Sequence, residues 1–416
     1  MLAPDIIIPF DDLNANIPSN WVRDTAFDDR IPVHSNTGTG TTGGSNTHTH
    51  TVQSHNHALN THAHTVSFAY YEEASGGGSG ANANPKRRHY HTSVSSSSMS
   101  AANSSSDGFT TGSGSTLPPY YEVIYIRSTG YNLIPPNGIL FSQSSLSNLV
   151  LCNGGSGTPN LEGKFLKGAS AGGNAGGTGG TTNHTHDISH SHSSGASHTH
   201  SGTSGAYAGD TSSHSGADSK DGVNAHTHTF TTGATVAPIN SYSGSGAGDT
   251  LVYPPYHTLK PFKNMAGVSV PLQEGAIAMT KLATPPIGWL ICDGTNGTPN
   301  LPSKYVMASA TAGTTGGATT HTHANVSHTH TSSSHSHTGT TDSASPSTYQ
   351  TGDGSYRGRS PHTHTLSTDS QTATYANSNI VFDSGSSIPA YIEVKYIMAT
   401  QAALGGGSAS VIDHFI

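Results

Sequence analysis

The histidines are the residues of this chain whose type and spacing point most directly to chemistry. There are 28 of them in 416 residues, and 24 of these form twelve His-x-His pairs. In an extended strand, residues i and i+2 point to the same side and lie about 6.5–7 Å apart. Imidazole nitrogen is a common ligand for transition metals. Each pair therefore predicts two metal ligands on one face of a strand.

The pairs form three sets of four that recur at a fixed interval. The first pairs of the sets begin at positions 48, 184 and 321, and the fourth pairs begin at 89, 226 and 362. A fixed period is the signature of tandem copies. We therefore predict three repeats, at residues 1–130, 131–266 and 267–400, followed by a docking tail at 401–416. His34, His214, His257 and His414 stand outside the pattern.

Corresponding pairs of the three repeats supply six nitrogens, the number that an octahedral ion requires. We interpret them as four stacked layers of ligands. Layer 1 is His48, His50, His184, His186, His321 and His323. Layer 2 is His55, His57, His190, His192, His328 and His330. Layer 3 is His62, His64, His198, His200, His335 and His337. Layer 4 is His89, His91, His226, His228, His362 and His364.

Six imidazoles favour an octahedral metal, with about one ion in each of the four layers. Fe(II) is our first choice, and nickel and zinc are the alternatives, although zinc prefers four tetrahedral ligands. Histidine-rich tracts can also bind metal loosely, but loose binding needs neither the i, i+2 spacing nor a repeat in register. A catalytic metal needs an open coordination position, which six histidines do not leave.

Strands must position these pairs, and the apolar residues show where the strands lie. Each histidine segment is followed by a proline-aromatic stretch: LPPYYEVIYI (117–126), YPPYHTLKPF (253–262) or IPAYIEVKYI (388–397). Alternating Ile, Val and Tyr predict half-buried strands. The second and third histidine segments are preceded by similar segments at 149–170 and 288–310, and the first by a weak counterpart at 17–36.

The expected fold is mostly β and irregular, with a small β hub and an elongated, metal-threaded, three-stranded needle. No segment shows the apolar periodicity of a helix. The histidine arms carry almost no aliphatic residues, so we expect them to be disordered unless something other than a core orders them.

Composition excludes several classes of protein. Only 32% of the residues are hydrophobic and 10% charged, and the net charge of −8 argues against a nucleic-acid partner. No apolar run reaches the roughly 18 residues of a membrane span, and the N-terminus lacks the basic region of a secretory signal. Two cysteines, Cys152 and Cys292, cannot form a disulfide scaffold and are expected to be buried hydrophobes.

Two further residue types in the hub, tryptophan and glycine, have expected structural roles. Trp21 and Trp289 are expected to pack in the hub core with the cysteines. Gly163, Gly168 and the Gly-Gly dipeptides are expected to form turns.

The segments LVLCNGGSGTPNLEGKFLKGAS and GWLICDGTNGTPNLPSKYVMASA resemble the collar domain of phage tail fibres. A His-x-His arm followed by a PPYY or IPAY strand resembles the receptor-binding tip of T-even long tail fibres. The resemblance implies three intertwined strands threaded by octahedral iron ions, with the far end touching the host surface. In that family three chains associate, whereas this chain carries three copies itself. We therefore expect a single-chain pseudo-trimer; the alternative is a homotrimer with about twelve ions in three successive needles.

The segments between the third and fourth pairs differ among the repeats and are expected to form the distal tip. Tyrosine and arginine concentrate binding energy at interfaces, so these residues are the expected receptor contacts. They are Tyr70, Tyr71, Arg87, Arg88, Tyr207, Tyr349, Tyr356, Arg357 and Arg359. The alternative is that they are solvated turns.

The resulting expectation is a virion tail-fibre or tail-tip adhesin, extracellular and not an enzyme. Its partners would be a host outer-membrane protein or glycan and, through the termini, other virion tail proteins. The alternatives are a purely structural capping protein of a virion or filament, and a carbohydrate-degrading tailspike. A tailspike would need paired carboxylates, and no such pair stands out among 24 acidic residues.

Overall fold

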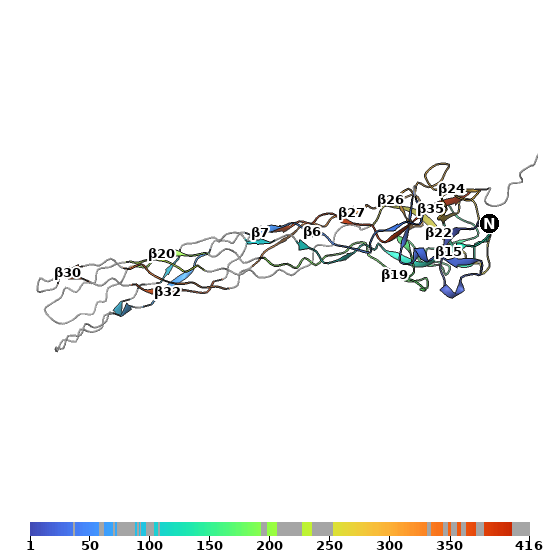
Figure 1. Ribbon diagram of the computed structural model, residues 1–416. Helices are drawn as coiled ribbons and strands as arrows, with labels where there is room; N and C mark the ends of the chain where they lie inside the picture. The colour runs from blue at the N-terminus through green and yellow to red at the C-terminus, as the bar shows by residue number, and fades with distance from the viewer. Residues whose placement is uncertain are drawn as a thin grey trace, which may run out of the picture.

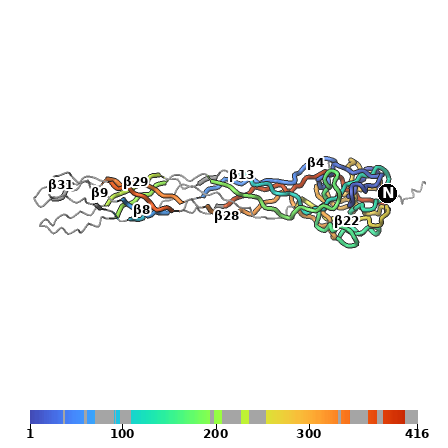
Figure 2. Tube along the Cα trace, turned by 90° about the horizontal axis from the view of Figure 1, so that it is seen from below, coloured from blue at the N-terminus to red at the C-terminus, as the bar shows by residue number. Residues whose placement is uncertain are grey.

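The computed structural model is elongated, with a body of strands at one end and a long, thin arm extending from it (Figures 1 and 2). It describes residues 1–35, 38–57, 62–69, 71–72, 88–89, 91, 93–96, 104–106, 109–192, 198–205, 227–234, 253–330, 334–343, 348–350, 356–358, 363–371 and 378–401. Over these residues the only helices are two 3-10 turns, η1 (Asn14–Asn16) and η2 (Thr25–Phe27). The prediction of a mostly β fold is confirmed.

The body is one sheet of fifteen strands. They are β1 (Ile6–Phe10), β2 (Trp21–Arg23), β3 (Ile31–His34), β4 (Thr42–Gly43), β15 (Tyr120–Ser128), β16 (Ile139–Ser142), β17 (Val150–Leu151), β18 (Lys164–Gly168), β19 (Thr178–Gly179), β22 (Tyr256–Lys263), β23 (Ile277–Thr280), β24 (Trp289–Ile291), β25 (Tyr305–Ala308), β26 (Thr315–Gly316) and β35 (Tyr391–Ala399). Pairing of β22 with β25 closes a ring through β16, β23, β1, β15 and β18. The three predicted proline-aromatic stretches form β15, β22 and β35.

Parallel pairs link each proline-aromatic strand, which ends the histidine segment of one repeat, to a strand of the next predicted repeat. Strand β15 pairs with β18, β22 pairs with β25, and β35 pairs with β3. The last pair joins the third repeat back to the first, so the three repeats are interleaved in one sheet. The weak counterpart at 17–36 also takes part, because it supplies β2 and β3.

Three apolar clusters hold the body together. Trp21 and Trp289 lie in one of them, and Cys152 and Cys292 lie in another. Both tryptophans and both cysteines are buried, as expected, but they do not pack in the same cluster. Gly168 lies within β18 rather than in a turn, and a Cβ there would lie 1.9 Å from the carbonyl oxygen of Phe27. Gly163 has φ +69°, which fits the turn expected there.

The arm contains short paired strands. They are β5 (Thr47–His48), β6 (Thr51–Val52), β7 (His55–His57), β8 (Thr65–Phe68), β9 (Tyr71–Glu72), β10 (Arg88–His89), β11 (Val94–Ser95), β12 (Ser104–Ser106), β13 (Phe109–Thr110), β14 (Gly114–Ser115), β20 (Ser201–Thr203), β21 (Thr229–Thr231), β27 (Thr320–His321), β28 (Val326–His328), β29 (Thr338–Thr340), β30 (Thr348–Gln350), β31 (Tyr356–Gly358), β32 (Thr365–Thr368), β33 (Ser378–Ile380) and β34 (Gly385–Ser386). Outgoing strands pair antiparallel with return strands of the same repeat, as in β5 with β14 and β27 with β34. The arm therefore contains paired return strands beside the three outgoing strands of the expected needle.

Among the described residues of the arm, apolar side chains form two small clusters. One contains Val52, Ile188, Ile380 and Phe382; Val52 and Ile188 lie along the chain between layers 1 and 2, and Phe382 pairs with Val52. The other contains Val66, Phe230 and Leu366, and lies between layers 3 and 4. The expectation that the arms have no apolar core is therefore wrong in detail. Residues that are far apart in sequence bring their apolar side chains into contact in these clusters.

Candidate metal centres

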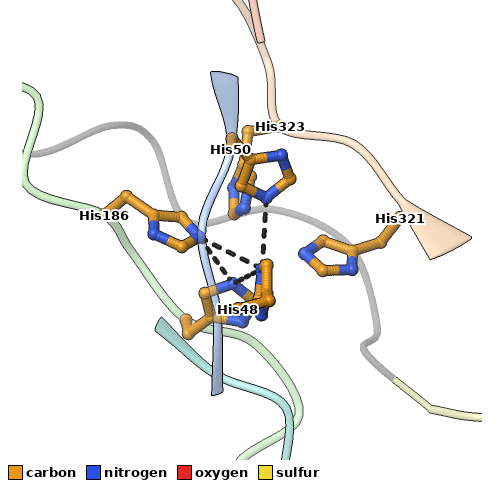
Figure 3. Close-up of side chains that lie close together, drawn as sticks. His48, His50, His186, His321 and His323 are labelled. Carbon is orange, nitrogen blue, oxygen red and sulfur yellow. Dashed lines mark hydrogen bonds between the residues drawn. The ribbon is translucent and has the colours of Figure 1, made fainter. Parts of the chain in front are cut away.

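Layer 1 comes together as predicted. Its six histidines each offer one ring nitrogen, and these atoms lie within 4.8 Å of one another. Figure 3 shows the rings converging from separate segments of the chain. The Nε2 atoms of His48, His184 and His186 are 3.0–3.2 Å apart, and His50 Nε2 is 3.1 Å from His48 Nε2.

These spacings suit an octahedral ion. Neighbouring vertices of an octahedron are separated by √2 times the distance from the centre, so the observed edges correspond to ligand distances of about 2.1–2.3 Å. Distances of that order are normal for bonds between imidazole nitrogen and a divalent metal.

The hydrogen bonds of the Nδ1 atoms define the tautomer of the rings. His50 Nδ1 lies 2.7 Å from the carbonyl oxygen of Asp383, and His186 Nδ1 lies 2.6 Å from that of Gly112. A carbonyl oxygen only accepts, so Nδ1 carries the proton and Nε2 of the neutral ring presents a lone pair. Metal-bound histidines characteristically donate their other N–H in this way. Several converging lone pairs repel one another unless a cation lies between them.

Electrostatics keeps three rings of layer 1 neutral. Burial, followed by the neighbouring histidines, lowers the pKa of His48 and of His184 to about 3. The same two causes lower the pKa of His321 to about 4. Protonated rings therefore cannot account for the close nitrogen contacts at neutral pH. The donor set fits a metal ion, and the six histidines of layer 1 would hold it.

Layer 2 is assembled less symmetrically. Its donor atoms form two overlapping groups of four, one with His55 and His190 and the other with His57 and His330; His192 and His328 belong to both. The Nε2 atoms of His190 and His192 are 3.1 Å apart. Burial is the main cause that lowers the pKa of His192 and of His328 to about 3.

One cause of this asymmetry lies in the second repeat. There the second pair follows the first after six residues, whereas the other two repeats have seven. His190 Nδ1 lies 2.8 Å from the carbonyl oxygen of Ile188 in its own strand, and its ring stacks on Phe109 with centroids 5.0 Å apart.

Layer 3 brings its histidines together with slightly wider spacing. One group contains His62, His64 and His200, and another contains His62, His198 and His335. The ring centroids of His62 and His64 are 5.4 Å apart, compared with 5.0 Å for His48 and His50 in layer 1. His337 joins the layer beside His64, with centroids 5.1 Å apart.

Layer 4 is described in part. The rings of His91, His228 and His364 meet with centroids 4.9–5.0 Å apart. His226 and His362 lie outside the described residues, and only the backbone of His89 is described.

Of the predicted tip contacts, Tyr70, Arg87, Tyr207 and Arg359 lie outside the described residues. Only the backbone is described for Tyr71, Arg88, Tyr349, Tyr356 and Arg357. Within this backbone, β9 pairs with β10 and β30 pairs with β31.

The cysteines show no sign of reactivity. Burial is the main cause that raises the pKa of the Cys152 thiol to about 12, and burial also raises the pKa of Cys292. Both thiols are therefore protonated and unreactive at neutral pH.

The groups that hold the histidines were not predicted from the sequence. They are backbone carbonyls such as those of Asp383 and Gly112, and buried hydroxyls such as Thr111, whose Oγ1 accepts from the His50 backbone N–H at 2.9 Å. No local signal could have found them, because serine and threonine occur throughout the arms.

Comparisons of the chain with protein-family models, with curated proteins and with solved structures find no match. The residues and their geometry are therefore the basis for assigning a function.

Proposed function

We propose that this chain is an extracellular adhesin of a virion tail fibre or tail tip, built as a metal-stabilised needle. The observation that carries the proposal is layer 1, where six histidines from three distant segments converge on one point. Such a set is suited to holding a thin arm together where little apolar surface is available. In the six-histidine layers, Fe(II) is the preferred ion, with nickel and zinc as alternatives, at about one ion per layer.

The arrangement of strands supports a single-chain pseudo-trimer. The three parallel pairs of the body connect the repeats cyclically, the third back to the first. One chain also supplies all six ligands of layer 1. Elemental analysis combined with native mass tests this: a monomer should carry about four ions and a homotrimer about twelve.

The far end of the arm is the proposed receptor-binding surface. Strand β30 lies at that end, away from the body (Figure 1), and the nine tyrosines and arginines named above belong to the sequence segments between the third and fourth pairs. The partner would be a host outer-membrane protein or a glycan, and the termini would join other tail proteins. Among the described residues, no helix has the length and apolar character to cross a membrane.

We propose no enzymatic activity. A saturated six-nitrogen site leaves no coordination position for a substrate. The alternative function is that of a structural cap, in which the arm would serve as a spacer and bind nothing at its end.

Adhesion is tested by binding of the purified chain to host cells and to a glycan array. Replacing Tyr349, Tyr356 and Arg357 with alanine should reduce binding at least tenfold, because aromatic and arginine anchors commonly contribute 2 kcal/mol or more. Tyr131→Ala is the matched control, since Tyr131 is 71% exposed on the body. Equal binding by the tip and control variants, or no binding by the wild type, would favour the structural cap.

A further inference from the structure

A reciprocal contact recurs beside the second histidine of the pairs. A buried serine or threonine donates its backbone N–H to the histidine carbonyl, and its hydroxyl accepts the histidine backbone N–H. The six couples are His50 with Thr111, His64 with Ser96, His200 with Thr232, His228 with Ser204, His337 with Thr368, and His364 with Thr341.

The residue that follows two of these threonines binds a histidine ring of another repeat. The residue after Thr232 is Gly233, whose carbonyl oxygen accepts from His337 Nδ1 at 3.0 Å. The residue after Thr368 is Asp369, whose carbonyl oxygen accepts from His64 Nδ1 at 3.0 Å. Each of these dipeptides thus holds the backbone of one histidine and the ring of another.

In layer 3 these contacts form a closed ring around the three repeats. Ser96 binds the backbone of His64 at 3.0 Å, and its Oγ lies 3.3 Å from Nδ1 of His200. Thr232 with Gly233 then links His200 to His337, and Thr368 with Asp369 links His337 back to His64. The backbone hydrogen bonds to Ser96, Thr232 and Thr368 hydroxyls are 2.7–3.0 Å long.

From this ring we infer that Ser96, Thr232 and Thr368 are positioning residues for the layer 3 metal site. They hold His64, His200 and His337 at one level of the arm and in a defined cyclic order before an ion binds. All three are buried, so removing a hydroxyl leaves a histidine N–H without its partner. The inference rests on the metal-binding part of the proposed function and is independent of adhesion.

The test compares two triple variants of the full chain. S96A/T232V/T368V removes the hydroxyls while nearly keeping side-chain shape, and S96T/T232S/T368S retains them. Each metal-free protein is loaded with Co²⁺ and challenged with EDTA. The hydroxyl-free variant should take up the same number of ions at saturation but bind one of them 10–100-fold more weakly, the usual effect of losing an outer-sphere partner. The hydroxyl-retaining variant should match the wild type.

A second background shows which layer responds. In H62A/H64A, where layer 3 is already broken, the hydroxyl-free substitutions should not change Co²⁺ release further. Unchanged affinity in the hydroxyl-free variant, or an equal weakening of every ion, would overturn the inference. If the triple variant does not fold, Thr232→Val against Thr232→Ser makes the same comparison.

Hydrogen exchange of the metal-free protein separates this inference from the proposed function. The amides of His64, His200 and His337 should exchange faster in the hydroxyl-free variant than in the wild type. If the wild type binds no Co²⁺, the proposed metal-stabilised needle fails, whereas unchanged exchange at these three amides contradicts the positioning role.

Discussion

At the scale of the residue, several arm histidines bind the protein through one ring nitrogen and turn the other into a layer. His228 Nδ1 donates to the carbonyl of Asp342 and His364 Nδ1 donates to that of Ala69, at 2.9 and 2.8 Å. This arrangement repeats what His50 and His186 show in layer 1. A carbonyl that fixes the tautomer also fixes the ring orientation, so less ordering is left for the ion to impose.

The arm should lose stability as the pH falls from about 6.5 towards about 3. Burial lowers the pKa of His48 from 6.5 to about 3 and that of His198 to about 4, so the unfolded chain takes up protons before the folded chain does. The stabilisation is complete above pH 6.5 and declines below it. Hydrogen exchange of arm amides at pH 7 and pH 5 measures this, and equal protection at both values would contradict it.

Replacing His55 and His57 together with alanine should remove one bound ion and lower the melting temperature of the arm. Both side chains point into layer 2, whereas Asn56 between them is exposed. Asn56→Ala is therefore the matched control and should leave the metal content unchanged. Elemental analysis gives the count, and an unaltered count in the double variant would refute the layer 2 assignment.

At the scale of the element, three glycines control where the arm leaves the body. Gly44, Gly180 and Gly317 have φ of +69°, +75° and +75°. A Cβ at these positions would lie 2.0–2.1 Å from the carbonyl oxygens of Pro389, Pro118 and Pro254. Each Gly-Gly dipeptide thus allows the outgoing chain to approach the proline that precedes β35, β15 or β22 closely. This approach lies four residues before the first histidine pair.

Gly180→Ala should reduce the free energy of unfolding of the body by about 3 kcal/mol or more, because the added methyl group meets backbone and φ is positive. Gly172→Ala is the control: its φ is +74°, but nothing lies within 4 Å of the added Cβ, so it should cost only about 1–2 kcal/mol. Denaturant unfolding compares the two. Equal losses would show that the approach to Pro118 carries no extra cost.

At the scale of the whole molecule, the two parts are stabilised by different means. The body buries three apolar clusters, whereas the described part of the arm has two small ones and a column of histidines. Unoccupied layers would leave buried ring nitrogens facing one another, which is costly in a low-dielectric site.

Removing metal with a chelator should therefore open the arm and leave the body folded. Limited proteolysis of chelator-treated protein is expected to cut within residues 47–115, 184–234 and 320–386, while β15, β22 and β35 stay protected. Re-addition of Fe²⁺ or Ni²⁺ should restore resistance. Metal-free protein whose arm resists proteolysis as well as loaded protein would show that the histidine layers do not stabilise it.

The periodicity of this protein and the six histidines of layer 1 can be predicted from the sequence alone. Period-two spacing places both imidazoles of a pair on one strand face, and a period near 136 residues puts matching pairs at matching levels. These are local or repeating features, so layer 1 could be predicted residue by residue, as could the three proline-aromatic strands.

How the rings are held and how the strands pair depends on contacts between residues far apart in the sequence. Ser96 and His200 are 104 residues apart, and Asp383 and His50 are 333 apart. Such contacts depend on which return strand lies beside which outgoing strand, and a serine that accepts a histidine N–H looks like any other serine in these arms. The two apolar clusters described in the arm could not be predicted for the same reason. Each consists of single apolar side chains from distant segments, and no one segment is apolar enough to indicate a core.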